Sequence, residues 1–592
     1  MSKVQELQNL LQPEVLAADI VSKYSQWKVQ RDVKESEWLE LRNYLFATDT
    51  STTSNRTLPW KNSTTTPKLA QIRDNLHANY MAALFSNPDW MKWEGDNADD
   101  NIRKKREGIE AYMKNKIKGA GFELVIARLL YDYIDYGNVF GEVVFVNEEI
   151  TDVDTGEIIK GYVGPKLVRT SPLDIVFNPT APSFQQSPKI VRYIKSIGEL
   201  EQELLERPDL DYDPLIMQKI KDNRMAIGAY RDSDLDKAEG YLLDGFGSMR
   251  EYYASGYVEI LEFEGDIYDN ASQTYYKNHL ITIVDRKYVV RNKQNPSWLG
   301  HGARGHVGWR ERPDNLYAMG PLENLVGMQY RIDHLENLKA DALDLTIHPP
   351  VVITGDVESF IWEPGAEIHV SDGDGSVSLL SPNVAAFQVN NEIAYIMSLM
   401  DEMSGSPKEA MGIRTPGEKT AFEVQQLQNA AGRIFQDKIG KFEKEFIEPI
   451  LNIMLEVGRR NLIGADVVRI MDDELGMADF LSITKEDIKA SGKLRPLGSS
   501  HFAAQAQLVQ NMSGVFGSPV GQMIAPHVST KNLAKAVEEL FGWEKYSVIR
   551  ENVAIFEQAE TQQLIASLQE QQAVEQATPV EPGLPPQEVI PQ

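Results

Sequence analysis

The segment MGIRTPGEKTAFEVQQLQ, residues 411–428, comes close to a phosphate-binding loop. The residues that could serve a nucleotide phosphate are two glycines, a lysine and a hydroxyl side chain: Gly412, Gly417, Lys419 and Thr420. In the consensus, the lysine directly follows the second glycine, so that backbone amides and ammonium group surround the same phosphates. Here Glu418 intervenes, which displaces the lysine and places a carboxylate where anions would bind. The spacing therefore disfavours a nucleotide site.

The flanking sequence favours a structural role for this loop. A phosphate loop follows a buried strand, whereas EIAYIMSLMDEM, residues 392–403, has helical spacing. Thr420, with Glu423 three residues later, fits a capping box that satisfies backbone donors at the start of a helix. The sequence predicts a loop over 405–419 and a long helix over 420–462.

No other arrangement of side chains predicts catalysis or metal binding. The segment SDGDGS, residues 371–376, places Val377 and Asn383 where a calcium loop needs glycine and glutamate. His301 and His306 lack carboxylates at ligand spacing. The sequence contains no cysteine, which excludes disulfides, thiolate catalysis and cysteine zinc sites. We expect no catalytic residue, no metal and no cofactor.

The composition indicates an acidic, folded protein of several domains. The chain has 592 residues, with 87 acidic against 60 basic side chains and a formal net charge of −27. Proteins that hold nucleic acid neutralise its phosphates with basic surfaces, so this chain would repel DNA unless its basic residues cluster. Neither a signal-peptide core nor an apolar run of about 18 residues is present, which favours an aqueous setting.

The order of predicted elements indicates an α+β fold. Helical spacing dominates up to about residue 120, and alternating strands dominate 140–310. A helix over 321–348, a short β-containing insert over 349–388 and a second helix over 389–404 follow. In the first of these helices, apolar residues recur at three or four and form one seam: Leu325, Met328, Ile332, Leu335, Leu338, Ala342 and Leu345. The seam of the second helix is Ile393, Ile396, Met400 and Met403.

This order resembles the core of bacteriophage portal proteins, the head-to-tail connectors of tailed phages. The resemblance covers roughly residues 70 to 500. Four segments carry it in the family's order: YDYIDYGNVFGEVVF, SPLDIVFNPTA, YAMGPLENLVGMQYRIDHLENLKADALDLTIHPPVV and EMSGSPKEAMGIRTPGEKTAFEVQQLQNAAGRIF. The family implies an N-terminal arm and wing (1–320), a first stem helix (321–348), a clip (349–388), a second stem helix (389–404), a tunnel loop (405–419), a long spine helix (420–462), a wing return (463–500), crown or barrel helices (501–575) and a Pro-rich tail expected to be disordered (576–592).

The resemblance also suggests which residues meet DNA and partners. The tunnel loop carries three basic residues that would touch the DNA backbone: Lys408, Arg414 and Lys419. The charge balance motivates a second hypothesis, that acidic side chains of the stem helices face the channel and repel the DNA phosphates, so that the DNA slides with little friction. The candidate residues are Asp333, Glu336, Asp341, Asp344 and Glu392. The alternative, an outward and solvated acidic face, stays equally open. In the clip, Trp362 is the candidate anchor for a partner, or a filler of the subunit interface.

The family implies a ring, usually of twelve copies, at one capsid vertex, through which DNA enters and leaves. Its partners would be the terminase large subunit, the tail adaptor, the major capsid and scaffolding proteins, and double-stranded DNA in the channel, with no membrane. The expected location is the virion, and the host cytoplasm during assembly. Two alternatives remain: a nucleotide hydrolase that uses residues 412–420, and another virion adaptor or scaffold protein without an axial channel.

Overall fold

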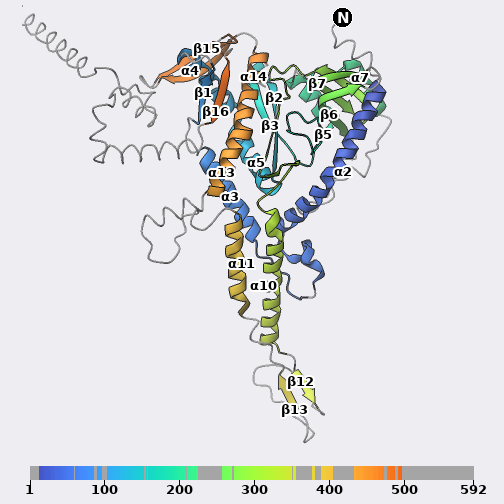
Figure 1. Ribbon diagram of the computed structural model, residues 1–592, viewed down its shortest axis with the longest axis vertical. Coiled ribbons are helices and arrows are strands. Elements are labelled where there is room, and N and C mark those ends of the chain that lie inside the picture. Colours follow the sequence, from blue (N-terminus) through green and yellow to red (C-terminus); the bar gives the residue numbers. More distant parts are fainter. Residues whose placement is uncertain are drawn as a thin grey trace, which may run out of the picture. The chain divides into compact units, whose positions relative to one another are not determined.

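The computed structural model shows an α+β chain in two compact units, one of Met1–Arg469 with Phe480–Ser500 and one of Ile470–Asp479 with His501–Gln592 (Figure 1). The structure describes residues 13–58, 60–85, 90–96, 103–151, 155, 158–207, 210–224, 257–269, 273–349, 351–354, 376–379, 388–404, 433–462, 465–472, 477–486, 488 and 491–496. Almost all of these belong to the first unit, which is the one described below.

Helices dominate the start of the described chain, as their apolar spacing predicts. They are α2 (Pro13–Phe46), the 3₁₀ helices η1 (Thr50–Thr52) and η2 (Ser54–Thr57), α3 (Lys68–Leu84), α4 (Arg103–Gly119) and α5 (Phe122–Asp135). After α5 the chain turns into a strand at Gly137, whose φ is 65°. A Cβ at this position would lie 2.3 Å from the amide nitrogen of Gly320, so only glycine fits this helix-to-strand turn.

Two antiparallel sheets form the body of the first unit. The five-stranded sheet has the order β4 (Ile175–Phe177), β5 (Lys189–Ser196), β6 (Tyr257–Asp269), β7 (Thr274–Val284) and β8 (Tyr288–Gln294). The three-stranded sheet has the order β3 (Ile158–Thr170), β2 (Asn138–Thr151) and β9 (Arg304–Gly308). Helices α6 (Ile197–Glu206) and α7 (Pro214–Arg224) pack on the larger sheet through Leu200 and Ile220. The prediction of strands across 140–310 is therefore confirmed for the described residues.

Four further strand pairs complete the described sheets. They are β10 (Arg310–Arg312) with β11 (Asn315–Met319), β12 (Val351–Thr354) with β13 (Ser376–Leu379), β14 (Ala465–Asp472) with β15 (Met477–Thr484), and β1 (Met91–Gly95) with β16 (Gly492–Pro496). The sequence predicted no strand near residue 91. That strand has only five residues, and its partner lies about 400 residues further along the chain, so local spacing could not reveal it.

The two predicted seam helices are present with nearly the predicted bounds. The 3₁₀ helix η4 (Glu323–Leu325) leads into α10 (Val326–Ile347), and α11 (Val389–Met403) runs beside α10 in Figure 1. Between them, β12 and β13 pair antiparallel with Val351 opposite Leu379. The largest apolar core joins both helices to α3, α5 and α14.

The long helix that follows is interrupted where the sequence predicts a distortion. Proline at 449 has no amide hydrogen and clashes with the carbonyl four residues earlier, which predicts a bend near Glu445. The described part of this helix consists of α13 (Arg433–Phe442), a π-helical turn η6 (Glu443–Ile447) and α14 (Glu448–Asn461). The π turn lies directly before Pro449 and includes Glu445, so the proline disturbs the backbone at the expected place.

Candidate functional site

Helix α10 carries an apolar seam and a polar face. The first part of the seam carries Ile332 and Leu335, which are buried in the same apolar cluster as the α11 residues Ile396 and Met400. A second face carries a polar ladder, spaced four residues apart along the helix: Gln329, Asp333, Asn337 and Asp341. The last part of the apolar seam, which we call the outer face, consists of Leu338, Ala342 and Leu345. Leu338 is 45% exposed and Leu345 is 47% exposed, so this face is apolar and open to solvent in the single chain.

The predicted apolar seam of α10 is therefore only half buried. Its first part, to Leu335, packs as predicted, whereas Leu338 and Leu345 stay exposed. For Leu345 the reason is the short reach of α11, whereas Leu338 lies level with the first turn of α11 and is exposed there. Lys339 donates to Asn390 Oδ1 at 3.1 Å, which places the first turn of α11 opposite the middle of α10. The last two turns of α10 thus extend beyond the described part of α11.

The polar ladder binds an extended segment of the same chain, residues 61–66, which we call the strap. At one end, the amide of Thr66 donates to Asp333 Oδ1 at 3.0 Å, and Gln329 Nε2 donates to the Thr66 carbonyl at 2.5 Å. In the middle, Asn337 accepts from the amide of Thr64 and donates to its carbonyl, each at 2.8 Å. These side chains contact the main chain of the strap as a neighbouring β-strand would.

At its other end, the strap is held by two carboxylates, those of Asp341 and Asp344. The amides of Lys61 and Asn62 each donate to Asp341 at 2.9 Å. The Asn62 side chain donates to Asp341 Oδ1 at 2.7 Å and to Asp344 Oδ2 at 3.1 Å. Asp341 therefore accepts three hydrogen bonds from two consecutive residues.

The match between strap and ladder follows from backbone geometry. Four residues of an α-helix rise about 6 Å, and two residues of an extended strand advance about 6.6 Å. Successive ladder residues can therefore meet alternate strap residues, as Asp333 meets Thr66 and Asn337 meets Thr64. The strap then enters α3, whose first residue Lys68 forms a 2.7 Å ion pair with Asp401 of α11. The strap thus ends where both α10 and α11 contact α3.

This arrangement overturns part of the acidic-channel hypothesis. Asp333 is 0% exposed and is covered by the strap, so its carboxylate does not face a channel in this state. Burial raises its pKa to about 6. For Asp341, partial burial raises the pKa, but the hydrogen bonds from Lys61 and Asn62 outweigh it, and the net pKa is lowered. The error arose because helical spacing cannot show that a distant loop covers a polar face.

The other predicted residues are placed as follows. Glu336 is half-buried and forms an ion pair with Lys339 one turn away on its own helix. Asp344 is exposed and accepts from Asn62, and Glu392 is exposed in the first turn of α11. Lys408, Arg414 and Lys419 of the predicted tunnel loop and Trp362 of the predicted clip lie outside the described residues.

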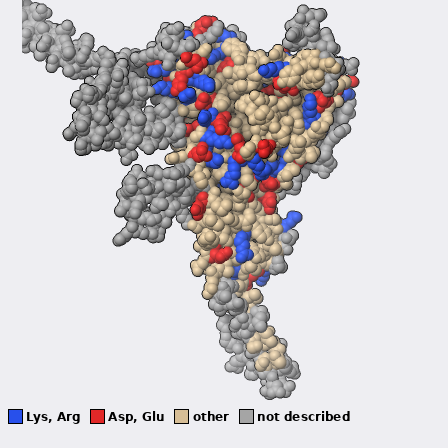
Figure 2. Space-filling model, viewed as in Figure 1, with Lys and Arg blue, Asp and Glu red and all other residues tan. Residues whose placement is uncertain are grey.

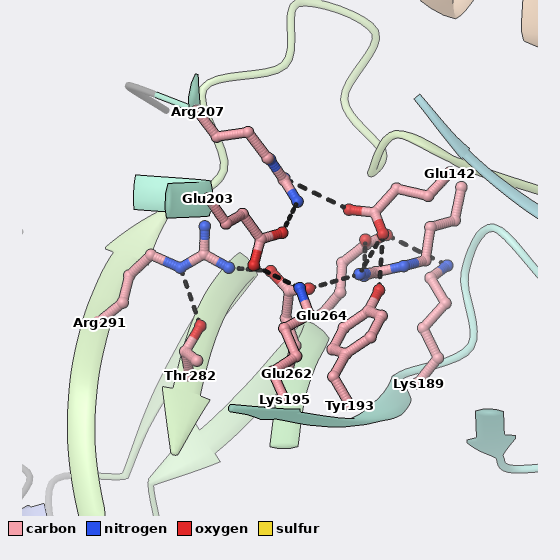
Figure 3. Close-up of polar contacts among 11 residues, drawn as sticks. Glu142, Lys189, Tyr193, Lys195, Glu203, Arg207, Glu262, Glu264, Thr282 and Arg291 are labelled. Carbon is pink, nitrogen blue, oxygen red and sulfur yellow. Dashed lines mark hydrogen bonds and ion pairs between the residues drawn. The ribbon is translucent and has the colours of Figure 1, made fainter. Parts of the chain in front are cut away.

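A buried network of charges joins the two sheets, and sequence reasoning did not find it (Figure 3). Its centre is Arg304 of β9, which is 2% exposed. The guanidinium group contacts Glu264 and Glu262 of β6 at 2.7 Å each, and Glu142 of β2 at 3.1 Å. One cation therefore links three carboxylates from both sheets.

Further cations and hydrogen bonds neutralise the same carboxylates. Lys189 lies 3.3 Å from Glu264, Arg291 pairs with Glu262, and Tyr193 donates to Glu142 at 2.8 Å (Figure 3). Arg207 reaches both Glu142, at 3.9 Å, and Glu203, at 3.1 Å. Burial alone would raise the pKa of Glu142, but the charges of Arg304 and Arg207 lower it to about 2. Glu142 is thus ionised at neutral pH and serves as a structural partner rather than as a proton-transfer group poised near neutral pH.

A cleft of about 390 Å³ lies elsewhere in the first unit, lined by Trp298, Arg459, Lys485 and Glu486. The Lys485 ammonium lies 5.7 Å from the centre of the Trp298 ring, and Arg459 lies 5.4 Å from that of Trp93. The backbone amide of Trp298 donates to Glu456 at 3.0 Å. The cations therefore face aromatic rings, and the lining residues include no serine, cysteine or histidine that could act as a nucleophile or base.

Comparisons with known proteins add no family to this geometry: no family model matches the chain, and no curated protein matches it. Among the described residues, no three His, Asp or Glu side chains are grouped so that they could hold a metal ion. Across that same part of the chain, no helix combines the length and apolar character that membrane crossing requires.

Proposed function

We propose that the chain is a phage portal protein, one subunit of a ring that conducts DNA at a capsid vertex. The observation that carries this proposal is the open outer face of α10, formed by Leu338, Ala342 and Leu345. It occurs on a helix whose first seam residues are buried in the core and whose polar face is occupied by the strap. Large apolar side chains left exposed on a rigid helix favour contact with another protein surface.

A ring supplies such a surface without a second kind of protein. In a cyclic assembly, one face of each copy packs on a different face of the next copy. Helix α11 offers Tyr395, which is 65% exposed, on the neighbouring element. We propose that the outer face of α10 packs on the α11 side of the next copy. Completing the burial of each half-exposed leucine would contribute about 1 kcal/mol per contact.

The surface charge agrees with a channel that does not retain DNA. In the view of Figure 2, the positive and negative side chains of the described residues are interspersed, and no broad basic patch covers this face. Tight DNA binding requires many positive charges that neutralise phosphates. An acidic chain with dispersed cations suits transient contact with a moving duplex.

Electron microscopy of the purified protein tests the proposal. We expect closed rings, usually of twelve copies, with an axial opening wide enough for duplex DNA. The matching measurement in solution is a sedimentation mass near twelve times 66.7 kDa. Particles without an axial opening would instead favour an adaptor or scaffold protein. A chain that remains monomeric at high concentration would contradict the proposal.

A further inference from the structure

The loop that carries the strap is held almost entirely by polar contacts. This loop, residues 47–67, which we call the flap, connects α2 to α3. Its buried residues are Thr50, Thr53 and Asn55, and none of its described apolar side chains is buried. Trp60 only rests edge-on against His334 of α10, with ring centres 4.8 Å apart. The flap therefore contributes little hydrophobic burial to the core on which it lies.

Within the flap, the strap is paired to the start of η1. The Thr50 amide donates to the Ser63 carbonyl at 2.9 Å, and Asp49 and Thr64 form an antiparallel bridge. These contacts lie inside the flap, so it can move without breaking them. The contacts that must break are those of the ladder, the hydroxyl pair between Tyr44 of α2 and Ser54, and the ring contact between Trp60 and His334. Water can replace each of the hydrogen bonds at a net cost of about 1 kcal/mol.

The closed flap also confines a carboxylate. Asp333 Oδ2 is buried and has no hydrogen-bond partner among the described residues, although Oδ1 accepts from Thr66 and Gln329. An ionised group in this position lacks the hydration that it would regain on opening. The buried carboxylate of Asp333 therefore opposes closure of the flap, whereas the hydrogen bonds of the other ladder residues favour it.

We propose that the flap is a releasable latch, which opens while the core stays folded and exposes the carboxylates of Asp333 and Asp341 on α10. In the closed state, the flap buries Asp333, and Asp341 accepts hydrogen bonds from the amides of Lys61 and Asn62. When the flap is open, α10 exposes a face of carboxylates. Its polar ladder could then hydrogen-bond to the main chain of any extended segment whose alternate residues match the spacing of the ladder. Segments held by few apolar contacts open locally at free energies below that of global unfolding. The latch belongs to the single chain and does not depend on ring formation.

Hydrogen exchange tests the latch on the full-length protein. In the wild type, the amides of Lys61, Asn62, Thr64 and Thr66 should exchange faster than those of strand β7, because they open locally. The double variant Asn337→Ala with Asp341→Ala should speed exchange in the strap by about tenfold or more, and leave β7 unchanged. Thr346→Ala, on α10 but outside the ladder, is the matched control and should change neither.

Two results would overturn the latch. Strap amides that exchange as slowly as β7 would mean that the flap opens only when the whole unit unfolds. A double variant that also exposes β7 would mean that the ladder supports the core rather than the flap. Because exchange is measured equally well on monomers and rings, a failure to assemble would contradict the proposed function and leave this result intact.

The Asp333→Asn variant tests the confined carboxylate separately. Because the pKa of Asp333 is raised from 3.8 to about 6 in the closed state, opening between about pH 4 and pH 6 would release a proton from this carboxyl group. Closure is therefore favoured at low pH and weakens as pH rises from about 4 to about 6, above which it is constant. The titratable groups that influence this carboxylate among the described residues are Glu336 on its own helix and Tyr44 of α2.

The variant should remove this pH dependence and raise strap protection at pH 7 by about tenfold. Protection is measured by exchange corrected for intrinsic rates between pH 4 and 8. An unchanged pH profile in Asp333→Asn would exclude this carboxylate as the opposing group.

Discussion

The Arg304→Met variant is expected to lose about 3–5 kcal/mol of unfolding free energy, because a buried cation is removed from three carboxylates. Methionine approximates the volume of the arginine stem but leaves Glu142, Glu262 and Glu264 with fewer positive charges around them. Folded domains are stable by only about 5–15 kcal/mol. A loss of this size would therefore lower the denaturation midpoint strongly, as tryptophan fluorescence during urea or heat denaturation would show.

The matched control is Arg495→Met, which removes an arginine from an exposed ion pair. Arg495 lies 3.1 Å from Glu94, and both side chains are about half exposed. Exposed pairs contribute less than about 1 kcal/mol, so this variant should denature close to the wild type. Equal midpoints for the two variants would show that the network does not stabilise the contact between the sheets.

Acid denaturation gives an independent measure of the same network. The pKa of Glu142 is lowered from 4.5 to about 2 in the folded chain. A lowered pKa contributes stability that is complete above the unfolded value and is lost as pH falls toward the folded one. The wild type should therefore lose stability between about pH 4.5 and pH 2, and Arg304→Met should show a smaller loss over that range.

The network also shows what the sequence could not reveal. Glu142 and Arg304 stand directly opposite each other on β2 and β9, yet 162 positions separate them in the chain. In a chain with 87 acidic and 60 basic residues, no local spacing distinguishes this pair from solvated charges. Pairing between distant strands decides which charges meet, and that information is not local.

Elements whose signal is periodic were predictable. An apolar repeat of three to four residues predicted the helices at 326–347 and 389–403. An apolar repeat of two residues predicted the strands of 140–310. Pro449 located the π turn because the proline ring acts within one turn of helix. In contrast, the polar spacing of Gln329, Asp333 and Asn337 was visible, but only the fold shows that residues 61–66 fill it.

The largest effect on assembly is expected from Leu338→Asp combined with Leu345→Asp. Both side chains are about half exposed in the single chain, so their replacement should cost the subunit less than about 1 kcal/mol. In a ring, the new carboxylates would be buried against the next copy, at a cost of several kcal/mol per ion. Every interface of a ring carries this cost, so the equilibrium should shift from rings to single subunits.

Sedimentation and electron microscopy distinguish the outcomes of this variant. We expect folded single subunits with the helical circular dichroism and the denaturation midpoint of isolated wild-type subunits. Leu215→Asp is the control, since Leu215 is 75% exposed and belongs to α7, which lies away from α10 and α11 in Figure 1. Rings of unchanged mass in the double variant would mean that the outer face of α10 does not contact another copy. Rings lost equally in Leu215→Asp would mean that added charge, rather than this face, controls assembly.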